Sequence, residues 1–305
     1  MKQYKLVNNL TGWLAFIIAA VTYCMTVEPT ASFWDCPEFI TTGYKLEVGH
    51  PPGAPFFMLT ANFFSMFAGP SKVALMVNIM SAILSALGIL FLFWTITHIA
   101  RRLFTREGKP LTTANAIAVL GAGAVGALAY TFTDTFWFSA VEGEVYALSS
   151  MFTALVVWLM LRWEEEADEP HATRWIILIA YLMGLSIGVH ILNLLTIPAL
   201  VFIYYFRKTE RVTMKGIVLA TLLAGAILLV INGIIIPYTV YVGAMIDLFC
   251  VNTLGLPVNL GIGGAVQTGY IYAAEHGYET AVQVDGDGQH DVSYLNAMYD
   301  AMKEK

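Results

Sequence analysis

Long apolar runs separated by short polar connectors occupy the first 250 residues of the chain. A helix needs about 20 apolar residues to cross a bilayer, and the runs predict seven such helices. A shorter apolar run at 56–68 follows Pro51, Pro52 and Pro55, and we expect it to form a helix lying at the membrane interface. The predicted spans are 12–27, 72–100, 112–132, 150–161, 174–189, 192–206 and 216–238.

The composition agrees with this pattern and divides the chain in two. Hydrophobic residues make up 58% of the 305 residues and charged residues 12%, whereas a soluble domain carries roughly 25% charged residues. After Asn252 the sequence becomes rich in Gly, Asp and Gln. We therefore predict a membrane domain at 1–255 and a different segment at 256–305. Membrane lipid is an expected partner and nucleic acid is not. Cys36 and Cys250 are interpreted as free thiols rather than a disulfide.

The distribution of basic residues predicts the orientation. The two acidic connectors, 28–54 and 132–149, contain only Lys45, whereas the other connectors hold nearly all the Lys and Arg. By the positive-inside rule the N-terminus is cytoplasmic and both acidic connectors face the outer side of the membrane. The basic connectors are 2–5, 101–109, 162–174 and 207–215.

The two acidic connectors carry the candidate chemistry. Asp35 and Glu38 lie in the first, beside Trp34, and Glu142 and Glu144 lie in the second. Carboxylates held at a membrane surface lose hydration, which raises their pKa towards values suited to a general base. A flat aromatic ring such as Trp34 suits contact with a sugar. Ionisable clusters in this setting are costly, which favours a function for them.

Other polar residues of these regions have simpler interpretations. His50, in the motif HPPG, either binds a phosphate or caps the turn into the next helix, and the sequence leaves both open. His190 and Asn193 interrupt an apolar region, where we predict an interhelical hydrogen bond. Three further acidic residues of the connectors are expected only to solvate them: Glu28, Glu47 and Asp134.

Four motifs in order, EPTASFWDCPEFI, GHPPGAPFF, AVEGEVYALS and GLSIGVHILNLL, resemble the bacterial protein O-mannosyltransferase-like family of integral-membrane (GT-C) glycosyltransferases, over about residues 8–258. The resemblance implies a lipid-phosphate-linked sugar donor, a protein Ser or Thr acceptor and a bacterial inner membrane. It implies Asp35 as the base and Glu38 as its neighbour. From their own chemistry and placement, His50, Trp34, Glu142 and Glu144 are predicted to bind the substrates. Because relatives continue with further spans, we expect a truncated member of that family.

The tail resembles a different enzyme class. A predicted helix at 265–276 and strand at 280–284 lead into DGDGQHD, as in family 2 (GT-A) nucleotide-sugar glycosyltransferases. Asp285 and Asp287, one residue apart, can ligate Mg²⁺ or Mn²⁺ through oxygen. We expect a partial α/β segment, joined to the membrane domain by a fusion at LPVN, residues 256–259.

The expected fold is therefore an all-α polytopic membrane protein with about seven transmembrane helices, GT-C-like and truncated, followed by a partial α/β segment. The expected function is transfer of a sugar, mannose by the resemblance, from a lipid phosphate to a protein hydroxyl. One alternative is a membrane-anchored GT-A synthase of polyprenyl-phosphate sugars. Another is a transporter or scaffold, which predicts charged residues inside several spans, where the sequence has few.

Overall fold

A computed structural model describes residues 2–51, 53–105, 110–254, 270–279, 281 and 299–300. The chain divides into two compact units, Met1–Tyr238 and Thr239–Lys305. Every regular element among the described residues is helical and none is a strand. The prediction of an all-α polytopic protein is therefore confirmed for the part of the chain that is described.

The helices follow the apolar runs. The long ones are α1 (Lys2–Met25), α4 (Val73–Phe104), α5 (Thr113–Thr131), α7 (Val145–Glu166), α8 (Thr173–Ile187), α9 (Ile197–Lys208), α10 (Met214–Val230) and α11 (Ile236–Leu254). The short ones are α2 (Cys36–Lys45), α3 (Pro55–Ser65), η1 (Pro70–Lys72), α6 (Asp134–Ala140), η3 (Ile191–Thr196) and the π-helical η4 (Ile231–Ile235).

Among the described residues, six helical stretches are long and apolar enough to cross a membrane, and α8 is a shorter apolar helix. These seven coincide with the seven predicted spans. One boundary was predicted wrongly, because helix continues past residue 238 to Leu254. Pro237 does not end it, since it lies at the second residue of α11 directly after the π-helical turn, where its missing N–H is tolerated. The six stretches are Gln3–Met25, Pro70–Phe104, Thr113–Thr131, Val145–Glu166, Ile191–Lys208 and Met214–Cys250.

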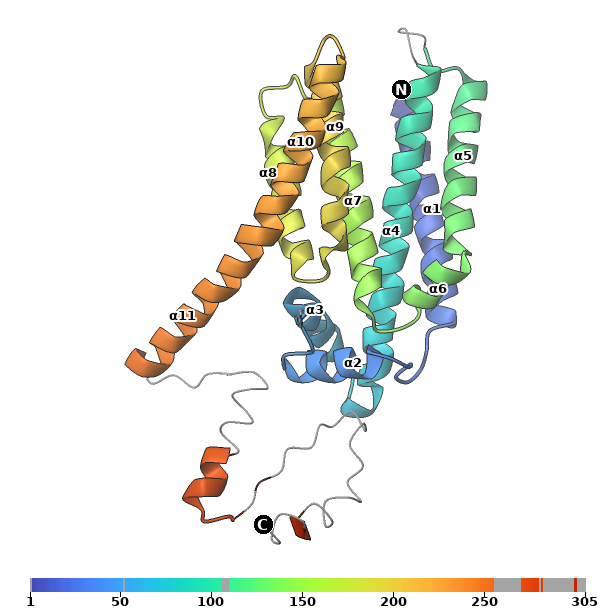
Figure 1. Ribbon diagram of the computed structural model, residues 1–305. Coiled ribbons are helices and arrows are strands. Elements are labelled where there is room, and N and C mark those ends of the chain that lie inside the picture. The colour runs from blue at the N-terminus through green and yellow to red at the C-terminus, as the bar shows by residue number, and fades with distance from the viewer. Residues whose placement is uncertain are drawn as a thin grey trace. The chain divides into compact units, whose positions relative to one another are not determined.

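Helix α4 is central to the first unit and packs against α1, α5 and α7, which run beside it (Figure 1). Small residues allow these close approaches. Ala15 and Ala19 of α1 and Ala82 and Ala86 of α4 are all at most 4% exposed, in one cluster with Phe93. Packing of small side chains is what holds membrane helices together when lipid is as apolar as they are.

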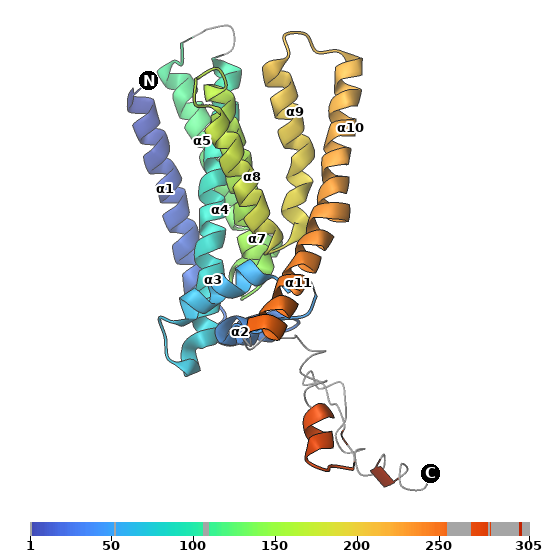
Figure 2. The ribbon, with the colours of Figure 1, turned by 90° about the vertical axis from the view of Figure 1, so that its left-hand side faces the viewer.

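Helices α2 and α3 lie across one end of this bundle, the end away from the N-terminus (Figures 1 and 2). Residues 36–45 were expected to be loop, but they form a helix because Cys36, Phe39, Ile40 and Gly43 recur at helical spacing and are all buried. They pack on Phe57 and other buried side chains of α3, the helix predicted at 56–68. The first acidic connector is therefore a folded cap rather than a loop.

The opposite end of the bundle holds the basic connectors. Arg101 pairs with Glu165, Arg102 with Glu164, and Arg207 with Asp168. These ion pairs bring the ends of α4, α7 and α9 together, as the predicted alternation of spans requires. Which side of a membrane this end faces remains a prediction.

The predictions for the tail are only partly testable. Residues 270–275 are helical, within the helix predicted at 265–276. The predicted strand at 280–284 falls, apart from Ala281, outside the described residues, as do Asp285, Asp287 and the proposed junction at 256–259.

Candidate active site

The first acidic connector is tied to the bundle at its start. Asn78 of α4 donates its amide to the carbonyl oxygens of Glu28 and Thr30, at 2.6 and 2.8 Å. The backbone N–H of Glu28 donates to Val141, in the second acidic connector, at 3.0 Å. The two connectors are therefore fixed to each other and to α4 at residues that come just before the candidate residues Asp35 and Glu142. Sequence reasoning missed Asn78, although an amide within the apolar run VALMVNIM was the available signal.

Asp35 lies at the N-cap of α2, yet its carboxylate makes no capping hydrogen bond. Its side chain is 60% exposed, and its backbone carbonyl accepts from Phe39 in the usual helical manner. Trp34, just before it, has a φ of 63° and is 91% exposed. A bulky residue in the left-handed region is strained, and such strain concentrates at functional sites. The backbone thus turns at Trp34 and leaves the Asp35 carboxylate free for other contacts.

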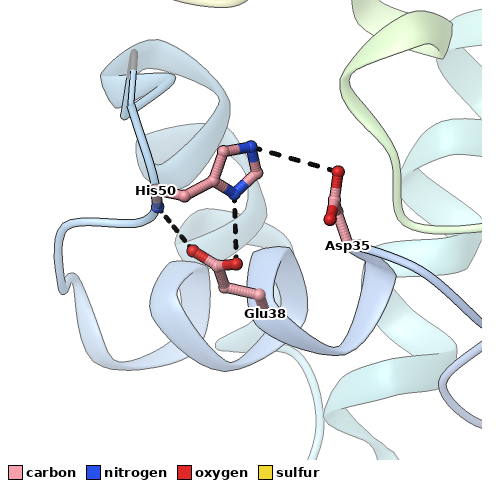
Figure 3. A group of neighbouring side chains, drawn as sticks. All are labelled: Asp35, Glu38 and His50. Atoms are coloured by element: carbon pink, nitrogen blue, oxygen red, sulfur yellow. Dashed lines mark hydrogen bonds and ion pairs between the residues drawn. The ribbon is translucent and has the colours of Figure 1, made fainter. Parts of the chain in front are cut away.

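Glu38, one turn into α2, holds His50 by two contacts (Figure 3). The backbone N–H of His50 donates to one carboxylate oxygen, and the ring Nδ1 lies 3.1 Å from the other. The other ring nitrogen, Nε2, then faces Asp35, 4.0 Å from its Oδ2 (Figure 3). The imidazole is therefore placed between two carboxylates, with Glu38 fixing its orientation.

The HPPG motif fixes His50 from the backbone side. Gly53 donates its N–H to the His50 carbonyl at 2.8 Å and has a φ of 84°, which a glycine adopts without strain. Phe56, in the first turn of α3, donates to the Gly188 carbonyl at 2.7 Å. The ring of Phe39 lies 5.5 Å from the imidazole. The turn into α3 is thus anchored to the end of α8, and His50 is held on three sides.

The second acidic connector supplies two buried carboxylates. Glu142 and Glu144 are each 7% exposed and flank Gly143, between α6 and α7. A Cβ on Gly143 would lie 3.0 Å from Asn78 Oδ1 and from a Val77 methyl, so only glycine fits without displacing them. This close contact explains the glycine of the GEVYA sequence. Gly143 thus lets the second connector pack closely against α4, next to Asn78, which holds the start of the first connector.

Burial and mutual repulsion change the acidity of these two groups. Burial raises the pKa of Glu142, against a hydrogen bond from Ser32 that lowers it. Burial, followed by the negative charges of Glu142 and Asp35, raises the pKa of Glu144 to about 7, while His50 acts in the opposite direction. The charge of Asp35, in the first connector, thus acts on Glu144, in the second. The raised carboxylate pKa expected from the sequence is found at these two residues.

The site can also be considered for a metal. One ligand atom from each of Asp35, Glu38 and His50 lies within 4.8 Å of the other two. Carboxylate oxygen and imidazole nitrogen suit a divalent cation such as Zn²⁺ or Mn²⁺. Among the described residues, Asp35, Glu38 and His50 form the group whose ligand atoms lie close enough to share a metal ion. The metal site predicted from the sequence, at Asp285 and Asp287, lies outside the described residues.

The remaining sequence predictions divide clearly. Asn193 donates to Ser186 Oγ at 2.8 Å and accepts from Thr153 at 3.3 Å, which confirms the predicted hydrogen bond between helices. His190 instead accepts from the Leu192 N–H and caps η3. Glu28 accepts from Thr30 within its own turn, consistent with a local role. Cys36 and Cys250 are free thiols, as interpreted.

Fold and site together define a helical, polytopic membrane protein with a carboxylate–histidine site at one end of its bundle. A family model described as the Protein O-mannosyl-transferase TMEM260 N-terminal domain matches residues 35–213. The chain belongs to this family. The matched region contains Asp35, Glu38, His50, Glu142 and Glu144.

Two curated relatives carry the same description. The Protein O-mannosyl-transferase tmem260 of Dictyostelium discoideum is 24% identical over 200 residues, covering 63% of this chain and 22% of the relative. The Protein O-mannosyl-transferase TMEM260 of Mus musculus is 26% identical over 172 residues, covering 56% of this chain and 22% of the relative. The chain thus aligns with about a fifth of the length of each. No solved structure matches.

Proposed function

We propose that this chain belongs to a membrane glycosyltransferase that moves a sugar, mannose, from a lipid-phosphate carrier to a Ser or Thr hydroxyl of a protein. The family and the names of its curated relatives support O-mannosylation of proteins. The observation that carries the assignment to this site is the placement of His50 between Asp35 and Glu38, next to the buried Glu144. Such a group of acids and an imidazole provides both a proton acceptor and a positive charge.

The proposed reaction is a single displacement. The Asp35 carboxylate takes the proton from the acceptor hydroxyl as its oxygen forms a bond to the anomeric carbon of the sugar. The bond from that carbon to the lipid phosphate breaks, and the phosphate leaves with the bonding electrons. Asp35 suits the role of base because its carboxylate is 60% exposed and is not used to cap α2.

His50 is assigned to the leaving phosphate. When protonated, its imidazole carries positive charge beside the reacting centre, and Glu38 holds the ring in position. Placing a fixed charge where negative charge develops stabilises the transition state without later reorganisation. Glu38 is thus a positioning residue for His50, as well as the neighbour of Asp35 that the motif resemblance implies.

Glu142, Glu144 and Trp34 are assigned to substrate binding. Glu144 has a pKa of about 7, raised by burial and by its acidic neighbours, so near neutral pH a share of the molecules carries it protonated. A protonated carboxyl can donate a hydrogen bond to a sugar oxygen, which an ionised one cannot. Trp34, 91% exposed next to Asp35, offers its ring face to the sugar.

The orientation follows from charge. With the basic end of the bundle cytoplasmic, the Asp35 end faces the outer side of the membrane, where a lipid-linked donor and a protein acceptor can meet. The assignment to a bacterial inner membrane rests on the motif resemblance described above. The GT-A-like interpretation of 256–305, with Mg²⁺ or Mn²⁺ at Asp285 and Asp287, supplies no step of this reaction.

The central test is the substitution Asp35→Asn, assayed with the purified chain, polyprenyl-phosphate mannose and a Ser/Thr peptide. Loss of a general base lowers the rate by about 10²–10⁴-fold, so we expect transfer to fall by that factor while membrane insertion is unchanged. Asp134→Asn, in α6 of the second connector, is the matched control and should retain transfer. Full transfer by the Asp35 variant would contradict the role of Asp35 as the general base.

The two alternative functions make other predictions. A membrane-anchored GT-A synthase needs residues 260–305 and a nucleotide sugar, so deleting them would abolish its activity. A transporter or scaffold would show solute binding but no transfer by any variant.

A further inference from the structure

A cavity of about 480 Å³ lies between α1, α4, α7 and α8, at the end of the bundle opposite the candidate active site. Its aromatic wall includes Trp13, Trp94 and Trp158, and the rings of Trp94 and Trp158 lie 5.2 Å apart. Lys5 and Arg162 are among the charged residues that line it. An aromatic wall beside basic side chains is the arrangement that suits an amphiphile with an anionic headgroup.

Three residues that line this cavity each carry a buried polar atom without a hydrogen bond: His98, Trp94 and Asn8. The His98 side chain is 9% exposed and lies between two carboxylates, with Nε2 4.0 Å from Glu164 Oε2 and Nδ1 3.7 Å from Glu165 Oε1. The indole N–H of Trp94 and Oδ1 of Asn8 are likewise buried and unbonded. Because these atoms are buried, the basic side chains are the groups that a ligand in the cavity would contact.

The charge around the cavity is not balanced. Glu165 is shared by two guanidinium groups, those of Arg101 and Arg162. Lys5 lines the cavity and has no ion pair with any described residue. Among the charged residues in and around the cavity, the basic residues outnumber the acidic ones. The basic members are Lys5, Arg101, Arg102, Arg162 and Arg174, and the acidic members are Glu164, Glu165 and Glu166.

A second cavity of about 750 Å³ adjoins the first and indicates what the rest of the ligand is. It lies between α1, α4 and α5 and shares Tyr4 and Arg101 with the first cavity. Val7, Ile117 and Leu120 provide apolar lining, and Ile117 is 66% exposed. Apolar surface that continues from a charged pocket matches acyl chains attached to a headgroup.

We propose that the cavity between α1, α4, α7 and α8 binds the phosphate headgroup of an anionic phospholipid, with Lys5, Arg101 and Arg162 around the phosphate. The acyl chains lie along the apolar lining of the adjoining cavity. This site shares no residue with the Asp35 site, so it is independent of the proposed transfer reaction.

The test is native mass spectrometry of the full chain, delipidated and given equal amounts of phosphatidylglycerol and phosphatidylcholine with the same acyl chains. We expect retention of phosphatidylglycerol over phosphatidylcholine. Lys5→Gln should weaken phosphatidylglycerol binding about fivefold, the effect of one basic residue near an anionic lipid. Because Lys5 is exposed and unpaired, this variant should fold normally. Lys5→Arg keeps the charge and should bind as the parent does.

Lys215→Gln is the matched control, since Lys215 is an exposed lysine in the first turn of α10 that lines neither cavity. Equal retention of both lipids would overturn the proposal. So would an equal loss in the Lys215 variant, because it would indicate a general charge effect. Glycerol 3-phosphate serves as the soluble probe. If it displaces phosphatidylglycerol at equal concentration, the site recognises soluble phosphate esters and the lipid assignment is wrong.

Discussion

The two ends of the helical bundle differ in how their carboxylates are paired and buried. At the basic end, Glu164, Glu165 and Asp168 each contact at least one arginine. At the other end Glu142 and Glu144 are buried with no ion pair to any described residue. Paired carboxylates can stay ionised and hold helices together, whereas buried unpaired ones gain a raised pKa. The comparison separates an end whose carboxylates hold helices together from an end whose buried carboxylates have a raised pKa.

After Asp35→Asn, the largest effect on transfer should come from changing Glu38, the residue that positions His50. Glu38→Gln keeps the size of the side chain but removes the charge that holds the imidazole. A hydrogen bond to a charged group contributes about 1.5–3 kcal/mol, so we expect transfer to fall about 10- to 100-fold. Glu47→Gln, an exposed glutamate of the same connector, should leave the rate unchanged. Equal rates in a transfer assay of the two variants would contradict the role given to Glu38.

The second prediction concerns the pH dependence of stability. The pKa of Glu144 is about 7 in the folded chain and 4.5 for an ordinary glutamate. Glu144 therefore binds more protons in the folded chain between these values, and the stability that this one group contributes is greatest below pH 4.5 and falls as pH rises to about 7. The loss is at most about 3 kcal/mol.

Thermal unfolding in detergent across this pH range checks that sign. Glu144→Gln cannot ionise, so it should lack this component and be more stable than the parent above pH 7. Asp134→Asn, a nearby acidic residue that is exposed, is the control and should preserve the parent profile. If the difference in stability between the parent and Glu144→Gln does not change with pH over this window, the raised pKa of Glu144 is refuted.

At the basic end, Glu165→Gln should reduce stability and spare transfer. Glu165 joins Arg101 of α4 to Arg162 of α7, and its side chain is 24% exposed. Its loss leaves two guanidinium groups without a shared partner, at a cost we place at about 1–3 kcal/mol, between exposed and buried pairs. The melting temperature and the transfer rate should be measured on the same preparation. A rate that falls without a change in melting temperature would show that this end takes part in catalysis.

The smallest effect should come from Gly143→Ala. The added methyl group would lie 3.0 Å from Asn78 Oδ1 and Val77 and 3.2 Å from Ile40, so these groups must move by a few tenths of an ångström. Overpacking of this kind costs about 1–3 kcal/mol, and here we expect the lower value. Gly121→Ala meets no atom within 4 Å and is the control. Equal melting temperatures for the two variants would show that the contact is not tight.

Much of the site was accessible from sequence because its residues lie close together in the chain. Asp35, Glu38 and His50 fall within one connector, and a charged, aromatic connector between apolar runs is conspicuous. The helix at 36–45 was predicted as loop because it is short and lies in an acidic connector, although its buried positions recur at helical spacing. Asn78 was missed because a single amide in a span has no local pattern that marks its partner.

The sequence by itself determined the helices and the polarity of the bundle. Apolar length fixes where helices form in a membrane, and connector charge separates an acidic end from a basic one. Only the tertiary structure decided that burial and nearby carboxylates raise the pKa of Glu144, that Asn78 ties the first connector to α4, and that Lys5 lies at a cavity with Arg101 and Arg162. Each of these depends on distances between residues far apart in the chain. Burial and electrostatic coupling follow those distances, which a local pattern does not encode.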